Sequence, residues 1–375
     1  MEKVSITEKK SFLKYKKSKK RFSKKINTNV KHNSFPLIVI YLLLFIGFII
    51  ICLTLIYFLI HKKKPDDSNV DPIIESYIKI EKDFCDNPDK YKNQKYEDDI
   101  ALYDVKLNDL KYQMYLSKSH SGLQSDVKNR GYYEKDVSNN MIEALKFYAS
   151  KNNKLDNKDI FMLDIGGNHG WYPSLLGRYG YTILTFEALE RNYYVSNKNY
   201  CLLNKDSNVI IIRKGLGAEE KKCNYFKHQN NEGNGMVLCD NKDVLNDKGF
   251  GKSFIKDSEV EITTLNTFMP YLYNKNIALI KLDVEGHELK VLEGGKELIT
   301  KYHVPFVVLE YSPGYLKEVG SEAKDLAQLF VDNGYKISTK GFLSKEYITI
   351  DELLNKPDFQ FDCYFIHESI TNILK

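Results

Sequence analysis

The stretch "FMLDIGGNHGWYPSLLGRYGYTILTFEALERN", residues 161–192, decides the fold class. An apolar run ends in Asp164, glycines follow, and a second apolar run ends in Phe186 and Glu187. This pattern predicts a strand, a glycine-rich turn, a helix and a second strand that ends in an acid. Because nucleotide-like ligands are often held by such a unit, the pattern favours an α/β domain with a ligand at the turn.

The same alternation continues beyond this stretch. We predict strands at 208–214, 277–283 and 304–311, and helices at 190–204, 287–302 and 322–334. Continuous apolar strands separated by helices predict a mostly parallel sheet covered on both faces. Residues 335–341 and 360–367 follow each other without an obvious crossover helix, so we expect them to form an antiparallel pair at one edge.

Four acids are predicted at or just beyond strand ends: Asp164, Glu187, Asp283 and Glu310. In an open α/β sheet the ligand lies at the carboxyl ends of the strands, where the strand order reverses. The four side chains are therefore expected at one edge, around one ligand.

The glycine turn indicates the class of ligand. A dinucleotide fingerprint needs Gly-x-Gly-x-x-Gly, but an isoleucine stands in place of its first glycine and Asp164 leads the turn instead. A carboxylate there suits an ammonium or hydroxyl group better than a pyrophosphate. S-adenosylmethionine offers both groups and no phosphate. We expect backbone N–H groups after Gly166 to bind its carboxylate and Glu187 to accept both ribose hydroxyls.

Three motifs carry a family resemblance: "LDIGGNHGWY", "FEALERN" and "IKLDVEGHELKVLEGG". In this order they resemble the FkbM-type S-adenosylmethionine-dependent methyltransferases, over about residues 110–345. The resemblance implies a class I methyltransferase-like, doubly wound, mostly parallel seven-stranded sheet with an antiparallel edge. The chain departs from the family at Asn266, where an Asp is usual. The residues assigned to the cofactor are Asp164, Gly166, Gly167, Asn168, Gly170, Glu187 and Asp283.

The segment "LDVEGHE", residues 282–288, is the expected reaction edge. Methyl transfer to oxygen needs a positioned acceptor hydroxyl and a base for its proton. His287 is the residue type best suited near neutral pH, although it could instead be a helix-capping or surface residue. Glu285 and Glu310 complete the catalytic candidates, with Glu310 either in the acceptor pocket or in a buried ion pair. Asp283 faces the cofactor or holds a divalent ion with Glu285; no metal is assigned as required.

The favoured function is therefore O-methylation of a hydroxyl on a sugar or glycan. Two other classes are weighed against it: a membrane-tethered nicotinamide-dependent oxidoreductase and a non-catalytic module that retains the fold. The missing first glycine of the dinucleotide fingerprint disfavours the oxidoreductase. The intact acids at 164, 187 and 283 disfavour the non-catalytic module. Nothing in the sequence predicts an oligomeric state.

Residues 37–60 contain no charge over 24 positions. As a helix they would extend about 36 Å, enough to cross a bilayer. A core helix or a cleaved signal peptide fits this length and flank less well. The expected organisation is a basic cytosolic tail at 1–36, a signal-anchor span at 37–60, a linker or stem at 61–109 and the domain at 110–375, with its core at 157–345.

The distribution of charge predicts the topology. Twelve Lys and Arg precede the span and three follow it, so the N-terminus is expected in the cytosol and the domain in the Golgi or ER lumen. After residue 64 the chain carries 40 basic and 48 acidic residues, a net charge of −8, which disfavours nucleic acid as a partner. The absence of any Asn-x-Ser/Thr sequon mildly disfavours N-glycosylation.

The cysteines have no C-x-x-C spacing and predict neither a disulfide framework nor a zinc site. One or two bridges remain open. Cys223 and Cys239 flank residues 226–240, a weakly periodic segment expected to be a loop over the pocket or a solvated hairpin, and a bridge between them is conceivable.

Overall fold

The computed structural model of the protein describes residues 47–48, 71–118, 122–152, 155–203, 207–228, 231–239, 254–357 and 359–374. The chain divides into two compact units, Met1–Asn69 and Val70–Lys375, and the second holds the fold described below. The predicted tail at 1–36 and all but two residues of the predicted span at 37–60 lie outside the described residues. Within the described ranges, no helix has the length and apolar character needed to cross a membrane.

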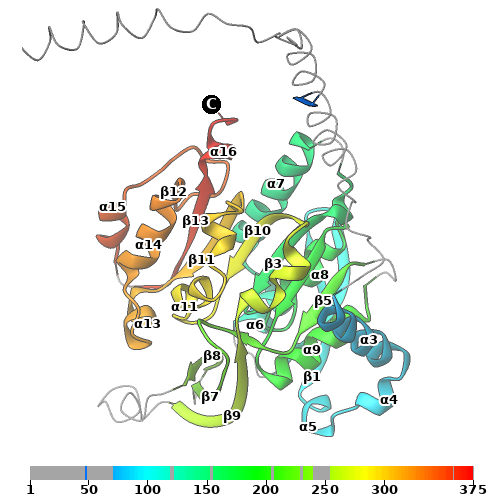
Figure 1. Cartoon of the computed structure of the whole chain (residues 1–375). Helices are drawn as coiled ribbons and strands as arrows, with labels where there is room; N and C mark the ends of the chain where they lie inside the picture. The colour runs from blue at the N-terminus through cyan, green and yellow to red at the C-terminus, as the bar shows by residue number, and fades with distance from the viewer. Residues whose placement is uncertain are drawn as a thin grey trace, which may run out of the picture. The chain divides into compact units, whose positions relative to one another are not determined.

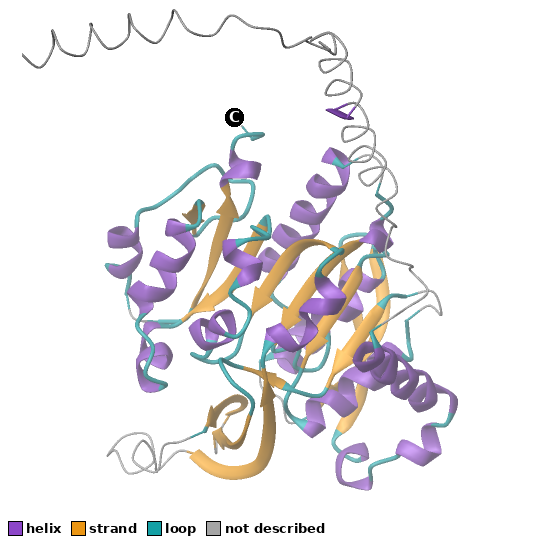
Figure 2. Ribbon diagram, in the orientation of Figure 1, coloured by secondary structure: helices purple, strands orange, loops and turns teal. Residues whose placement is uncertain are grey.

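A seven-stranded sheet forms the centre of this unit (Figures 1 and 2). Its order is β12-β13-β11-β10-β3-β4-β5. The strands are β3 (Ile160–Ile165), β4 (Thr182–Phe186), β5 (Val209–Ile212), β10 (Asn276–Leu282), β11 (Phe306–Tyr311), β12 (Tyr335–Ser338) and β13 (Phe361–His367). The chain runs outward from β3 to β5 and then returns to β10 on the other side of β3. The strand order therefore reverses between β3 and β10, which is where α/β sheets bind ligands.

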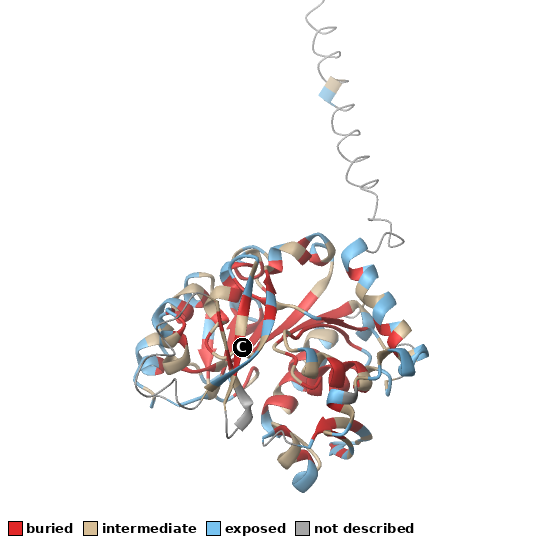
Figure 3. Cartoon of the chain, turned by 90° about the horizontal axis from the view of Figure 1, so that it is seen from below, coloured by how far each residue is buried: buried red, intermediate tan, exposed pale blue. Residues whose placement is uncertain are grey.

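Both faces of the sheet are buried, as the apolar strands predict. In β3, Phe161, Leu163 and Ile165 pack into one core, whereas Ile160 and Met162 pack into the other, because successive side chains point to opposite faces. The first core also receives α10 (Met269–Leu272), α11 (Glu288–Glu293), α12 (Glu297–Thr300) and α14 (Ala323–Asp332). The second receives α6 (Leu123–Arg130), α7 (Lys135–Lys151) and α8 (Trp171–Gly177). Figure 3 shows buried residues concentrated along the strands.

The sheet is mixed rather than a purely parallel one. The predicted antiparallel pair forms, with Tyr335 opposite His367 and Ser338 opposite Tyr364. However, β13 also pairs antiparallel with β11, so it lies inside the edge and β12 is the edge strand. The chain between them contains α15 (Ile350–Leu354), and α16 (Glu368–Thr371) follows β13.

A second sheet stands beside the carboxyl ends of the central strands, in the order β6-β9-β7-β8. Its strands are β6 (Gly215–Leu216), β7 (Lys221–His228), β8 (Asn231–Leu238) and β9 (Phe254–Thr263). Within the described part of the chain, strand β8 pairs antiparallel with β7 and with no other strand. The segment expected as a loop or hairpin at 226–240 therefore contains the end of β7 and all of β8.

The residues expected to be a stem do not separate from the domain. Helix α3 (Pro72–Asp86) places Ile74 in the main core and Phe84 against Tyr194 of α9 (Glu190–Tyr200). The disulfide Cys85–Cys201 joins the ends of α3 and α9. Two short helices, α4 (Pro88–Tyr91) and α5 (Gln94–Glu97), and the hairpin β1 (Ile100–Leu107)–β2 (Leu110–Ser117) follow. The compact unit that contains these elements begins at Val70.

Candidate active site

A cavity of about 560 Å³ opens at the reversal point between β3 and β10. Its walls come from the turns after β3, β4 and β10 and from the second sheet. Of the predicted site residues, the cavity is lined by Gly166, Asn168, Glu187, Asp283, Glu285 and His287. These residues are up to 121 positions apart in the sequence, and the sheet brings them together.

The turn after β3 requires glycine because two backbones meet there. Gly166 has φ 89°, and a Cβ on it would lie 1.9 Å from the carbonyl oxygen of Asp283. The N–H groups of Gly166 and Gly167 both donate to the carbonyl of Phe186, at 3.0 and 2.9 Å. The Gly170 N–H donates to the carbonyl of Gly167 at 2.8 Å. The N–H groups of Gly166 and Gly167 thus tie the turn to β4, while the expectation that N–H groups at the helix start bind a ligand carboxylate stays a prediction.

Glu187 lies at the end of β4 with both carboxylate oxygens held in place. Oε2 accepts from the Asn168 N–H and Oε1 from the Leu189 N–H, each at 2.7 Å. Burial raises the pKa of Glu187 to about 7, and the two backbone N–H groups partly oppose this rise. Each oxygen keeps a second lone pair, so this fixed carboxylate can accept further hydrogen bonds from a ligand in the cavity.

Asp164 lies behind the turn and does not line the cavity. It is fully buried, and its Oδ2 accepts from the Thr185 hydroxyl at 2.9 Å. Its Oδ1 has no hydrogen-bond partner in the protein. Burial raises the pKa of Asp164 to about 6, although the nearby Lys281 lowers it. Asp164 therefore affects a ligand through its charge and by fixing the position of the turn.

Lys281 is a buried cation next to Asp283. It is 6% exposed, its Nζ lies 2.7 Å from Asp283 Oδ2, and its ammonium stands 4.9 Å from the centre of the Tyr172 ring. Burial lowers the pKa of Lys281, but the surrounding carboxylates of Asp283 and Glu134 outweigh burial and raise it. A lysine inside the apolar run "IALIKLD" is a signal for a buried ion pair that the sequence analysis did not use.

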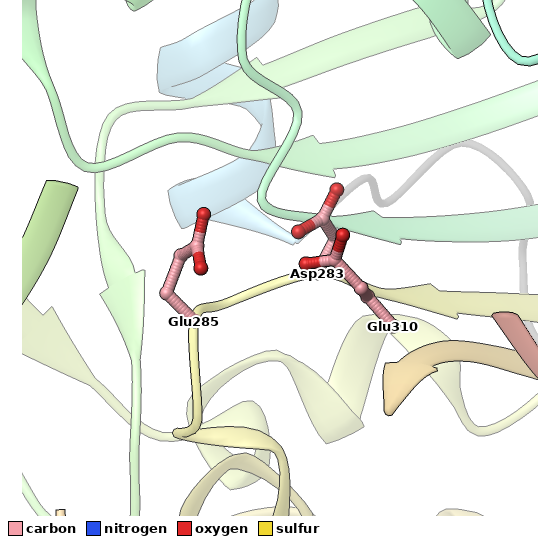
Figure 4. Close-up of side chains that lie close together, drawn as sticks. All are labelled: Asp283, Glu285 and Glu310. Carbon is pink, nitrogen blue, oxygen red and sulfur yellow. The ribbon is translucent and has the colours of Figure 1, made fainter. Parts of the chain in front are cut away.

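Asp283, Glu285 and Glu310 converge on one point (Figure 4). One carboxylate oxygen from each lies within 4.8 Å of the others, and such a group can hold a divalent cation. Gln360, which the sequence analysis did not single out, donates its Nε2 to Glu285 at 3.2 Å and to Glu310 at 3.3 Å. Burial and the charge of Asp283 raise the pKa of both glutamates well above the ordinary range.

His287 and Glu288 close the loop that follows Asp283. The Nε2 of His287 lies 2.7 Å from the carbonyl oxygen of Val237 in β8, so this nitrogen carries a proton and donates it. Burial lowers the pKa of His287 to about 4. Glu288 is buried and accepts from the N–H groups of Val284 and Gly286, each at 3.3 Å. The His287 ring thus joins the loop to the second sheet, and Glu288 fixes the loop itself.

An α/β sheet with a cavity at its reversal point, an acid at the end of the second strand and an acidic loop after the fourth is typical of α/β proteins that bind nucleotide-like ligands. Residues 164–337 match the model of the methyltransferase FkbM domain. The resemblance predicted from the three motifs is therefore confirmed over residues 164–337, which match this domain model.

A curated relative and several solved structures are similar to the chain. "Methyltransferase 1" of Beauveria bassiana is 30% identical over 146 residues, which cover 36% of this chain and 58% of the relative. A structure of WbdD is 13% identical, with 66% of this chain and 39% of that chain covered and a TM-score of 0.37. Magnesium protoporphyrin IX methyltransferase from Synechocystis, with bound SAM, is 10% identical over 78% of this chain and 97% of that chain, with a TM-score of 0.32.

Proposed function

We propose that the protein is a membrane-anchored S-adenosylmethionine-dependent O-methyltransferase that acts on a hydroxyl of a sugar or glycan. When bound, S-adenosylmethionine would supply the methyl group for the new bond to the acceptor oxygen. The residues of this chain bind and orient the two substrates and accept the proton.

The observation that carries the proposal is the hydrogen bonding around Glu187. Its carboxylate faces the cavity with fixed oxygens, an arrangement suited to accept from the two hydroxyls of a ribose. The N–H groups of Gly166, Gly167, Asn168 and Gly170 all donate within the protein. They therefore do not form the backbone cradle that a pyrophosphate needs, which favours a nucleoside sulfonium over a dinucleotide.

The acceptor site is assigned to the carboxylates beside the cavity. Glu285 lines the cavity, and its ionised carboxylate is the base assigned to the acceptor hydroxyl. It accepts the hydroxyl proton as the oxygen–carbon bond forms. Glu310 and Gln360 add further polar groups within reach of neighbouring hydroxyls, and the exposed ring of Phe359 stands next to Gln360 in the chain. Closely spaced acceptors suit a polyol such as a sugar.

The anchor and compartment rest on the N-terminal sequence and on the disulfides. An uncharged run of 24 residues with the richer basic flank before it favours a signal anchor with the domain on the lumenal side. The bridges Cys85–Cys201 and Cys223–Cys239 support an oxidising compartment, because such bonds are rare in the cytosol.

The test is transfer of labelled methyl from S-adenosylmethionine by the full-length enzyme. An extract fractionated into glycans, lipids and proteins serves as the acceptor. We expect label in the glycan fraction, and Glu285→Gln should reduce it by about 10²-fold or more if this group is the base. Label confined to proteins or lipids would contradict the assigned acceptor class, and an unchanged rate for Glu285→Gln would contradict the assigned base.

A further inference from the structure

Strand β8 is a wall of the cavity with few supports. Gly235, Val237 and Cys239 line the cavity. Among the described strands, it lies at the edge of its sheet and pairs with β7. An edge strand depends on its side-chain contacts and crosslinks to stay in place.

Among the contacts that the described residues make with β8, three bear on its position. Met236 and Leu238 are buried against Phe226 of β7. The carbonyl of Val237 accepts from the His287 ring on the loop after β10. A disulfide joins Cys239, directly after β8, to Cys223 in β7. The disulfide is the one covalent connection among these three contacts, and it is placed where the strand ends.

The two sulfur-bearing residues differ in their surroundings. Cys223 is 2% exposed and packs inside the second sheet, whereas Cys239 is partly exposed and lines the cavity. A ligand in the cavity would therefore cover the side of the bridge that a reductant can reach. The other bridge, Cys85–Cys201, does not line the cavity and offers a matched comparison.

We propose that the Cys223–Cys239 disulfide is a redox control on ligand binding, which keeps β8 in place as a wall of the cavity. A dithiol reductant transfers two electrons and two protons to the bridge, the S–S bond breaks into two thiols, and the reductant becomes a disulfide. The end of β8 then depends on the apolar contacts and the His287 hydrogen bond. The cavity loses part of its wall, and ligand affinity falls.

The effect of the disulfide on ligand binding must be matched by an effect of the ligand on the disulfide. If the bridge strengthens ligand binding by some factor, the bound ligand must stabilise the bridge against reduction by the same factor. S-adenosylmethionine should therefore protect Cys223–Cys239 from a dithiol and leave Cys85–Cys201 unprotected. This consequence rests on the cofactor of the proposed function, whereas the loosening of β8 does not.

The experiment compares the full-length protein with two double variants, Cys223→Ser/Cys239→Ser and Cys85→Ser/Cys201→Ser. Hydrogen exchange is measured over residues 231–239, and S-adenosylmethionine affinity is measured by calorimetry without reductant. We expect faster exchange in β8 and an affinity lowered by about tenfold in the first variant only. This change corresponds to a cavity wall that is in place in only about a tenth of the molecules. Reduction of the wild-type protein by dithiothreitol should give the same changes.

The outcomes separate this inference from the proposed function. Unchanged exchange of β8 after loss of the bridge overturns the inference whether or not the ligand binds. Faster exchange with unchanged affinity also overturns it, because the strand then moves without affecting the cavity. If the wild-type protein does not bind S-adenosylmethionine, the proposed cofactor fails, and the exchange measurement alone decides whether the bridge holds the wall.

Discussion

The two oxygens of the Glu187 carboxylate accept from Asn168 and Leu189, and burial raises the pKa of this group to about 7. A ligand that donates its hydroxyls to Glu187 binds the ionised form. Affinity for S-adenosylmethionine should therefore fall by about tenfold between pH 8 and pH 6, as the ionised fraction drops. Calorimetry across this range checks the prediction.

The matched variant is Glu187→Gln, which keeps the size of the side chain and one acceptor oxygen. It should bind weakly at every pH, and most of the pH dependence should vanish. If the dependence of affinity on pH persists unchanged in the variant, another group is responsible for it. Asp164 is then the next candidate, because its pKa is about 6.

A second residue-scale prediction concerns His287. Its Nε2 donates to the Val237 carbonyl, and burial lowers its pKa to about 4, so the ring is a weak base at neutral pH. We expect His287→Gln, whose amide can donate to the same carbonyl, to keep turnover within about tenfold of wild type, and His287→Ala to lose ligand affinity. Turnover reduced by about 10²-fold or more in the Gln variant, with affinity unchanged, would instead identify His287 as the base.

For single residues, the positions of the acidic side chains could be predicted from the sequence better than their hydrogen-bond partners. Asp283 and Glu187 were predicted at strand ends because apolar runs end there, and they line one cavity. The bond from Gln360 to Glu285 crosses 75 positions of sequence, and no local pattern indicates it. Likewise, the N–H groups after Gly166 were expected to face a ligand, but the carbonyl of Phe186 takes that of Gly167. Such pairings depend on which strands become neighbours.

Among the elements, α3 lies in the part of the chain that was expected to be a linker or stem. Its inward residues, Ile74, Glu81 and Phe84, include a glutamate, so the apolar stripe is interrupted in the sequence. The structure places Glu81 at 0% exposure, where it accepts from the Ile211 N–H of β5. The helix thus packs against the edge strand β5. Because one of its inward positions is a glutamate, its amphipathic pattern is not evident from the sequence.

Glu81 gives the prediction at the scale of elements. Burial raises its pKa well above the ordinary value, so the folded protein holds this proton more tightly than the unfolded chain. Stability is therefore lost as the pH rises above the unfolded pKa of about 4.5, because the folded form must either keep the proton or bury a charge. Glu81→Gln retains an acceptor for the Ile211 N–H and should raise Tm by at least about 2 °C at pH 8.

The comparison of two pH values isolates this effect. Near pH 4.5 the wild-type group is protonated in the folded state and half protonated in the unfolded state, so the gain from Glu81→Gln should be small there. An equal gain at pH 5 and pH 8, or a loss at pH 8, would show that the buried acid does not limit stability at alkaline pH.

For the molecule as a whole, Cys85–Cys201 is the longer crosslink, with 116 positions between its residues. It joins α3 to the end of α9 and so ties the first helix of the domain to the sheet layer. Closing a loop of about 100 residues restricts the unfolded chain by about 4.7 kcal/mol in the chain-entropy model, and removal of native bridges typically costs about 2–5 kcal/mol. Cys85→Ser/Cys201→Ser should lower the free energy of unfolding by that amount, measured by denaturant titration without reductant.

The control for this bridge is Cys223→Ser/Cys239→Ser, which opens a separation of only 16 positions. It should cost less global stability, about 3 kcal/mol at most, while it affects the cavity wall more. A larger loss of stability from the short bridge than from the long one would reverse the assigned roles of the two disulfides.

The last prediction concerns the orientation of the chain in a membrane. Twelve basic residues precede the uncharged run at 37–60 and three follow it, so the positive-inside rule places the N-terminus in the cytosol and residues 61–375 in the lumen. The two disulfides of the domain point the same way, because a lumenal site keeps them oxidised. Protease added to sealed microsomes should spare the domain and remove only the N-terminal tail, and detergent should make the domain accessible. Digestion of the domain in intact microsomes would mean that it faces the cytosol, and the bridges would then have to persist against the reducing glutathione pool.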